Sequence, residues 1–239
     1  IESCALHGIP HKEALKAAAA IECVHAYSLV HDDLPCMDDD ELRRGKPTVH
    51  KAWDESTAVL AGDALQSLAF LILGTLDLPS DRVVQAVIGL ATDAGKDGMV
   101  LGQARDIAAE SADAPLSLDA ITALQAQKTG ALIRWSATAG PVLTGNDFAP
   151  LASYATALGL AFQIADDILD ETGDETKTGK RLHKDADAGK ATFVSLLGLR
   201  GAQAMARSLV AQANDALCIY DARADGLRDA ANFVISREH

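Results

Sequence analysis

The sequence predicts an all-α fold, a single bundle of long, mostly antiparallel helices around a central cavity. Apolar residues recur with a period near 3.6, and no segment alternates apolar and polar residues, so we expect no strand. Hydrophobic residues make up 49% of the chain but aromatic residues only 4%, so alanine and branched aliphatic side chains build the core, and alanine favours helix. The 239 residues fit one domain, residues 1–239.

Glycine, proline and polar segments separate the predicted helices. Residues 11–34 form the first long helix, and Asp54 caps a second one that reaches residue 76. Because residues 61–74 are almost wholly apolar, we expect this second helix to lie deep in the bundle, with Asp63 either a buried, paired acid or a group that supports a site. Further helices are expected over residues 82–95, 98–110, from Ser117 through Gly130, over 147–172 and, as three shorter helices, over 190–239.

Two places inside these helices carry unusual residues. Gln103 and Asp106 lie three residues apart and face one side, either as a solvated polar surface or as part of a site. Gly130 costs about 1 kcal/mol relative to alanine inside a helix. A kink that exposes Lys128 and Thr129 would explain this glycine.

The stretch from residue 32 to 48, DDLPCMDDDELRRGKPT, is the strongest functional signal. Five aspartates and one glutamate fall within ten residues, and two arginines and a lysine follow. Carboxylates bind divalent cations, the cations bind phosphate oxygens, and arginines take the remaining negative charge. Pro35 cannot continue the preceding helix, and the break there is expected to bring Asp32 and Asp38 together to share metal ions.

A second acidic cluster, Asp166, Asp167 and Asp170, lies within FQIADDILDETGD. Asp166 and Asp170 are four residues apart and point the same way on a helix, where their repulsion favours a bound cation. The two acidic helices are expected to face each other across the cavity as antiparallel elements. The polar segment 173–189 that follows is either a solvated surface loop or a lid over phosphate.

Composition excludes several classes of function. The net charge of −13 argues against a nucleic-acid partner. No uncharged apolar run reaches 18 residues, so we expect no membrane span, and we see no signal peptide. The four cysteines form no zinc-binding spacing and indicate reduced thiols in a cytoplasmic protein. Cys36 lies within the first acidic stretch, but its oxygen-rich surroundings suit Mg²⁺ better than a softer metal.

Two long motifs resemble those of the trans-prenyltransferases, the polyprenyl synthetase family. HAYSLVHDDLPCMDDDELRRGKPTVH is similar to the family's first aspartate-rich motif, and FQIADDILDETGDETKTGK is similar to its second. LAGDALQSLAF, GQARDI, QKTGAL and GKATFVSLLG occur in the family's usual order, so the resemblance covers essentially the whole chain. It implies an all-α, homodimeric enzyme that uses Mg²⁺ and two diphosphate substrates.

The resemblance also implies a reaction. An allylic diphosphate ionises, and isopentenyl diphosphate attacks the resulting cation head-to-tail. Metal ions neutralise the diphosphate leaving group, and an apolar cavity keeps water from the carbocation. By the same resemblance the metal ligands are Asp32 and Asp38, with Asp33 in support, and Asp166 and Asp170.

Other positions match the family's substrate-binding residues. The allylic diphosphate is expected to contact Arg43, Lys128 and Lys180, and isopentenyl diphosphate to contact His25 and Arg44. Thr129 and Gln163 are expected to line the reacting end. The family's GGKRxRP segment, which holds isopentenyl diphosphate, has no match, so we expect the chain to lack its N-terminal segment.

Product length is expected to depend on Tyr27 and Ser28, five and four residues before Asp32. A bulky ring on the cavity floor should stop growth early, and here the sequence resembles bacterial family members that make farnesyl diphosphate, the C15 product. The alternatives are a C20 geranylgeranyl diphosphate synthase, a class I terpene cyclase and a non-catalytic synthase subunit. The few aromatic residues and the DDILD second motif argue against the cyclase. The presence of both aspartate motifs argues against the non-catalytic subunit.

Overall fold

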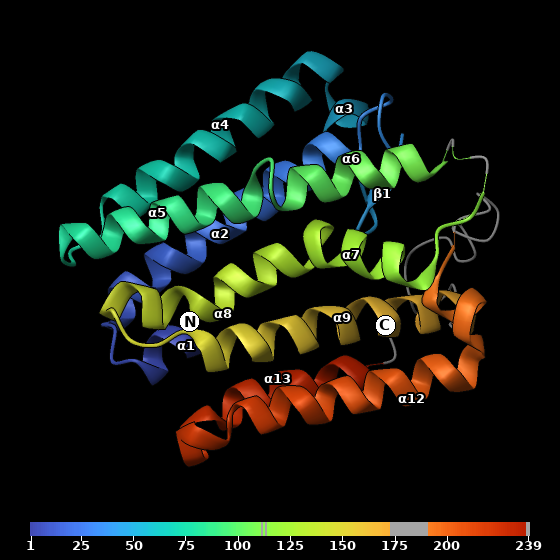
Figure 1. Ribbon diagram of the computed structural model, residues 1–239. Helices are drawn as coiled ribbons and strands as arrows, with labels where there is room; N and C mark the ends of the chain where they lie inside the picture. Colours follow the sequence, from blue (N-terminus) through green and yellow to red (C-terminus); the bar gives the residue numbers. More distant parts are fainter. Residues whose placement is uncertain (111, 113, 173–190, 238–239) are drawn as a thin grey trace.

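Long α-helices make up the fold in the computed structural model, which describes residues 1–110, 112, 114–172 and 191–237 (Figure 1). The prediction of an all-α fold is confirmed. The first half of the chain contains α1 (Glu2–Leu6), α2 (His11–Asp32), α3 (Val49–Ala52), α4 (Glu55–Gly74), α5 (Ser80–Ala94) and α6 (Met99–Glu110). The second half contains α7 (Leu118–Lys128), α8 (Gly130–Thr144), α9 (Ala149–Thr172), α12 (Phe193–Ala216), the 3-10 helix η1 (Cys218–Ala224) and α13 (Asp225–Ser236).

Polar side chains begin two helices, as predicted. Asp54 Oδ1 accepts a hydrogen bond from the Thr57 backbone N–H at 2.6 Å, at the start of α4. Ser117 Oγ accepts one from the Ala120 backbone N–H at 3.3 Å, at the start of α7. Each cap satisfies a backbone N–H that has no partner within its own helix.

Two hydrophobic clusters hold the bundle together. One joins α9, α12 and α13 and includes the fully buried residues Leu151, Ile164 and Phe193. The other joins α2, α4, α5 and α8 and includes Val24 and Leu73. Helix α8 contributes side chains to both clusters and packs against α5 and α9. Figure 1 shows the result, with α4 at one outer edge of the bundle and α12 at the opposite edge.

Helix α4 lies on the surface, and the prediction that it lies deep in the bundle is wrong. Leu60 and Leu71 are each 65% exposed, and Asp63 is exposed rather than buried. Only the opposite side, which includes Ala69 and Leu73, is buried as α4 packs on α2. Composition cannot distinguish a helix covered by its own chain from one with an exposed apolar side. By length and composition alone, α4 could cross a membrane, but only 22% of its most apolar window is buried, and one such helix is weak support for a span.

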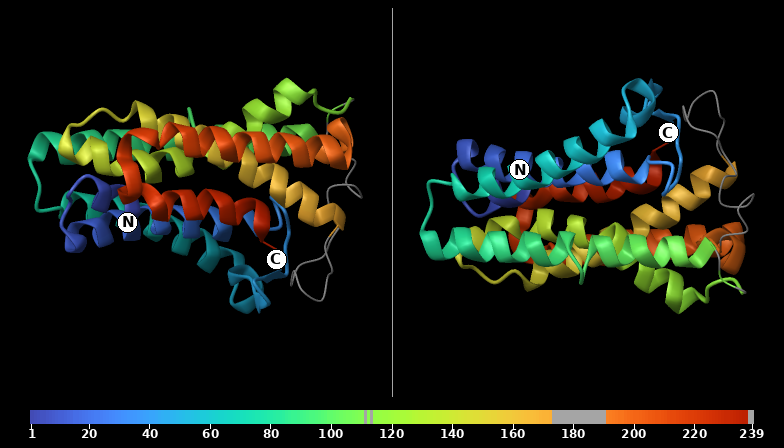
Figure 2. Two further views of the ribbon diagram at one scale, coloured as in Figure 1. Left: turned by 90° about the horizontal axis from the view of Figure 1, so that it is seen from below. Right: turned by 90° about the horizontal axis from the view of Figure 1, so that it is seen from above.

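Helices α2 and α9 run in the same direction, which corrects the prediction that they are antiparallel (Figures 1 and 2). Both acidic clusters lie toward the C-terminal ends of these helices. Only a parallel arrangement can bring the two clusters to one end of the bundle. The parallel direction of α2 and α9 is therefore what places both acidic clusters at the same end of the bundle.

Two local predictions also need correction. Strand β1 (Leu42–Arg43) pairs antiparallel with β2 (Lys46–Pro47), where no strand was expected. Two-residue strands are too short to produce an alternating pattern. Helix α12 has 24 residues rather than being short, because it continues through a kink at Gly198, where φ is 69°.

Candidate active site

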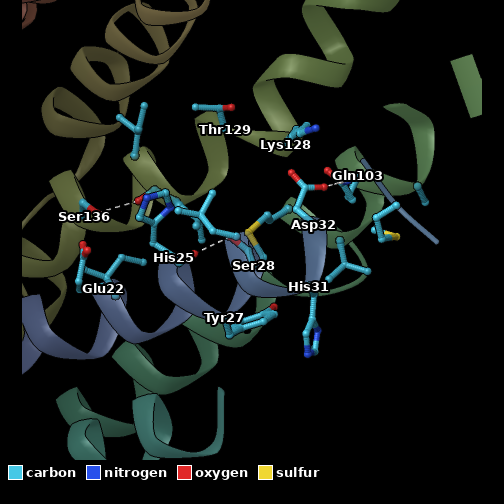
Figure 3. Close-up of a pocket in the computed structure, with 18 of the residues that line it drawn as sticks. Glu22, His25, Tyr27, Ser28, His31, Asp32, Gln103, Lys128, Thr129 and Ser136 are labelled. Carbon is cyan, nitrogen blue, oxygen red and sulfur yellow. Dashed lines mark hydrogen bonds between the residues drawn. The ribbon is translucent and has the colours of Figure 1, made fainter. Parts of the chain in front are cut away.

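A cavity of about 630 Å³ lies along the C-terminal half of α2 (Figure 3). Its lining from α2 includes Ile21, His25, Ser28 and Asp32, whose spacings of four, three and four residues place them on one helix face. The volume lies within the range of small-molecule sites. The opposite walls come from α6, α8 and α9 and are mainly apolar, with Met99, Val100, Ile107, Leu132, Ile133 and Phe162.

Close backbone packing assembles the polar end of this cavity. A Cβ atom on Gly102 would lie 2.1 Å from the backbone nitrogen of Lys128, so glycine lets α6 approach the end of α7. Helix α7 ends at Lys128 and α8 begins at Gly130, which confirms the predicted break. Lys128 and Thr129 both line the cavity. A Cβ atom on Gly159 would lie 3.2 Å from Cα of Gly130, so glycine here also allows α8 to pack closely on α9.

Asp32 is the central carboxylate of the cavity. Its Oδ1 accepts a hydrogen bond from Gln103 Nε2 (Figure 3). Burial raises the pKa of Asp32 to about 6, and the nearby charge of Asp38 adds to this shift, whereas Lys128 and Arg43 oppose it. A carboxylate kept from water in this way is strongly attracted to cations.

Lys128 is held by an acidic partner on α6. Its Nζ donates to Asp106 Oδ2 at 2.6 Å, and the two side chains are 24% and 15% exposed. Gln103 and Asp106 therefore belong to the site and do not form a solvated surface. Neither was among the site residues predicted from the sequence. Their three-residue spacing on one helix face was the signal that could have identified them.

The loop after α2 brings Asp38 back to Asp32, as the sequence predicts. The helix ends at Asp32, and the Asp38 backbone N–H donates to the Asp32 carbonyl at 2.9 Å. Asp39 follows with a φ of 47°, in the left-handed region. That conformation is uncommon outside glycine, although aspartate tolerates it better than most residues.

Arg43 binds within this loop. Its Nε donates to Asp33 Oδ1 at 2.8 Å, and its guanidinium also lies 3.6 Å from Asp40 Oδ2. Burial alone would lower the pKa of Arg43, but the hydrogen bond to Asp33 and the neighbouring carboxylates raise it overall. The Asp33 side chain is almost fully buried, so the ion pair fixes the loop to the end of α2.

The structure brings some predicted site residues into the cavity and leaves others outside its lining. The cavity is lined by His25, Tyr27, Ser28, Asp32, Lys128 and Thr129. The residues outside the lining are Asp33, Asp38, Arg43, Arg44, Gln163, Asp166 and Asp170. Arg44 is exposed, with a φ of 51°. Lys180 lies outside the described residues.

The second acidic cluster lies one to two turns beyond a cavity residue. Phe162 lines the cavity, and Asp166 and Asp170 follow it at four-residue intervals on the same face of α9. Asp167 points elsewhere, because its Oδ2 accepts from the Phe193 backbone N–H at 2.7 Å at the start of α12. Asp167 therefore fixes α9 to α12.

The carboxylates fit a divalent cation in their chemistry. They supply oxygen donors, which Mg²⁺ prefers, and the half-buried Asp32 carboxylate lies close enough to Asp38 for the two charges to interact. Within the described ranges, no three histidine, cysteine, aspartate or glutamate side chains gather around one point as a ready metal site. Mg²⁺ characteristically keeps several ligands from water or substrate phosphate, so such a dispersed set suits it.

Asp32→Asn is expected to stabilise the metal-free protein at pH 7.5. The pKa of Asp32 is about 6 in the folded state against 3.8 ordinarily, so the folded state loses stability as pH rises through this range. The substitution removes that cost, on the order of 1–3 kcal/mol at pH 7.5, and should give no gain below about pH 4. Urea unfolding of both proteins at both pH values measures the difference. Equal stability at pH 7.5 would contradict the raised pKa.

Comparison with known proteins identifies relatives over most of the chain. The farnesyl diphosphate synthase of Escherichia coli K12 is 49% identical over 207 residues, which are 84% of this chain and 69% of that protein. A solved FPP/GFPP synthase of Zymomonas mobilis superposes with a TM-score of 0.90 at 46% identity and covers 98% of this chain and 80% of its own. A geranyltransferase of Helicobacter pylori, solved with magnesium and isoprenyl diphosphate, superposes with a TM-score of 0.81 at 40% identity. The match covers 94% of this chain and 74% of the geranyltransferase chain.

The family assignment follows from these matches and from the site. A profile of the polyprenyl synthetase family matches residues 2–218, which include both aspartate-rich motifs. Asp32 of the first motif and Phe162 of the second line the cavity, and Asp166 and Asp170 follow Phe162 along α9. The resemblance inferred from the sequence is thus confirmed, and the chain belongs to the polyprenyl synthetase family of enzymes.

Proposed function

We propose that this chain catalyses Mg²⁺-dependent, head-to-tail condensation of isopentenyl diphosphate with dimethylallyl and then geranyl diphosphate, giving farnesyl diphosphate. One observation supports this most directly. One cavity has a half-buried carboxylate and a lysine at one end, and mainly apolar walls along the rest of its length. A diphosphate head and a hydrocarbon tail require this division of polarity.

The charged end is suited to the diphosphate of the allylic substrate. Lys128 Nζ can move from Asp106 to a phosphate oxygen, because a lysine carries three donors on a flexible stem. Thr129 places a hydroxyl on the same wall. When bound, Mg²⁺ would neutralise charge on the departing diphosphate and would be held by Asp32, Asp38, Asp166 and Asp170. In the sequence-based scheme, Arg43 and Lys180 also contact this diphosphate.

The apolar walls are suited to the reactive intermediate. Ionisation of an allylic diphosphate leaves a carbocation that water would quench, and the aliphatic side chains of α6 and α8 that line the cavity offer water no hydrogen-bond partners there. Gln163 and the Thr129 hydroxyl are proposed to stabilise the cation with their dipoles. His25 lines the cavity one helical turn before Ser28, where with Arg44 it is proposed to hold the acceptor diphosphate.

The chain should convert dimethylallyl diphosphate and labelled isopentenyl diphosphate to a C15 product only when Mg²⁺ is present. Asp32→Asn and Asp166→Asn should each lower turnover by about a hundredfold or more, since each removes charge that the departing diphosphate requires. Asp215→Asn, at an exposed aspartate on α12, is the matched control. Chromatography of the products measures chain length. A cyclic hydrocarbon would support a terpene cyclase instead. The absence of any product, also when the N-terminal segment of the family is supplied, would support a non-catalytic subunit.

Tyr27→Ala should lengthen the product to C20 or beyond. The Tyr27 side chain is buried, lines the cavity and contacts the His31 ring edge-on at a centroid distance of 5.9 Å. Its removal would open space into which a longer chain could grow. Tyr27→Phe keeps the ring and should keep the C15 product. An unchanged product from Tyr27→Ala would refute the role of Tyr27, and a C20 product from the unmodified chain would replace the C15 assignment.

We also propose that the enzyme is a homodimer, with the exposed side of α4 covered by a second copy. Leu60 and Leu71 are 65% exposed and three turns apart on one face, and Ile88 of the neighbouring α5 is 53% exposed. Large apolar side chains left exposed on two neighbouring helices favour an interface on this side of the bundle.

Leu60→Glu combined with Leu71→Glu should convert the dimer to monomer, because each charge would be buried without a partner at the interface. Sedimentation velocity measures the change. Ile219→Glu, at a 62% exposed position in η1, is the control and should leave the dimer intact. Binding of the unmodified chain to lipid vesicles, without self-association, would instead favour a membrane surface as the partner of α4 and would contradict the cytoplasmic prediction.

A further inference from the structure

We propose that Arg237 is an internal counterion for Asp166, and that it competes with the divalent cation for this carboxylate. The inference rests on the proposed function, in which Asp166 is a metal ligand. The site residues predicted from the sequence all lie at or before Lys180. The structure nevertheless brings Arg237, which follows Asp166 by 71 positions, to the second acidic cluster.

The contact is formed by packing between the last helix and the acidic one. Helix α13 packs against α9, and Arg237 follows its last turn (Figure 1). Arg237 Nη2 lies 3.3 Å from Asp166 Oδ1, and the guanidinium carbon lies 4.3 Å from the centroid of the Phe162 ring. The arginine side chain is only 13% exposed, so carboxylate and ring both hold it close to the protein surface.

The position of Asp166 explains why it attracts a cation. Asp170 follows Asp166 one turn later on the same face of α9, so the two carboxylates repel each other and favour a cation. A guanidinium relieves this accumulation of negative charge in the metal-free protein. Phe162 also lines the main cavity, so Arg237 lies directly behind a wall of the site.

The same contact is built to be displaced. The Asp166 side chain is 42% exposed, so its ion pair with Arg237 is partly screened by water. The buried Nε of Arg237 makes no hydrogen bond to any residue in the described parts of the chain. A divalent cation carries twice the charge and can approach a carboxylate oxygen more closely, so it should take Asp166 from Arg237.

Displacement of the Arg237 side chain from Asp166 should be detectable at the C-terminal end of α13. The Arg237 backbone N–H donates to the Phe233 carbonyl at 3.0 Å, which is the last backbone hydrogen bond described there. When the side chain is released from Asp166 and Phe162, this final turn loses two of its attachments. Cation binding should therefore loosen the C-terminal end of α13 while it orders the acidic end of α9.

The test measures cation affinity without substrate. Mn²⁺ serves as the spectroscopic substitute for Mg²⁺, and electron paramagnetic resonance counts free Mn²⁺ during a titration. Arg237→Gln should tighten Mn²⁺ binding about two- to fivefold, the range that a partly exposed ion pair supports. Arg237→Lys keeps the charge and should stay close to the unmodified chain. Arg207→Gln removes a charge from an exposed position on α12 and should change nothing.

A second readout follows the released segment. Hydrogen exchange at the backbone amide of residue 237 should become faster when Mn²⁺ or Mg²⁺ is added to the unmodified chain. In Arg237→Gln, exchange at the same position should already be fast without the cation. A purely structural role for Arg237 would lower stability but would not move the cation affinity.

The outcomes separate this proposal from the metal assignment. Equal affinities for the unmodified chain and Arg237→Gln, with binding weakened in Asp166→Asn, would overturn the competition and leave the metal site in place. Slower exchange at Arg237 on cation binding would also overturn it. Unchanged Mn²⁺ binding in Asp166→Asn would overturn the metal role of Asp166 itself, and with it the competition.

Discussion

Negative charge at the C-terminal ends of two parallel helices is the constraint on which this site depends. Asp32 and Asp33 end α2, and Asp166 and Asp170 lie in the last two turns of α9. The negative helix dipole disfavours the carboxylates in the last turn of each helix, and the like charge of Asp170 disfavours Asp166. The protein offsets the cost with cations from other elements: Lys128, Arg43 and Arg237. Each is paired with a carboxylate at or beside the site, and each is a donor that a diphosphate or a metal ion could rearrange.

Glycine makes this arrangement sterically possible. Gly102 lets α6 approach the backbone of Lys128, which places Gln103 and Asp106 beside Asp32 and Lys128. Gly62 on α4 leaves room for the His31 side chain on another side of α2, because a Cβ atom there would lie 2.0 Å from His31 Nε2. Both glycines reduce intrinsic helix stability by about 1 kcal/mol, and tertiary packing offsets this cost.

The bundle divides its surfaces between chemistry and association. The side of α2 that carries His25, Ser28 and Asp32 lines the cavity, and α4 packs against α2 while leaving its own outer leucines in solvent. A single helix thus separates the site from the apolar surface that we assign to a second copy. A change in dimerisation is therefore expected to alter the surroundings of Tyr27. This residue lies between the cavity and the exposed side of α4.

The sequence by itself determined the helices, the caps at Asp54 and Ser117, both aspartate clusters and the break at Thr129. These features depend on residues a few positions apart, which periodicity, proline and glycine report directly. Only the tertiary structure decided that α9 runs parallel to α2, that α4 is exposed, and that Gln103 meets Asp32 and Arg237 meets Asp166. Both pairs join residues that are 71 positions apart in the sequence. Such contacts depend on how whole helices pack, and the spacing of residues within one helix carries no information about that packing.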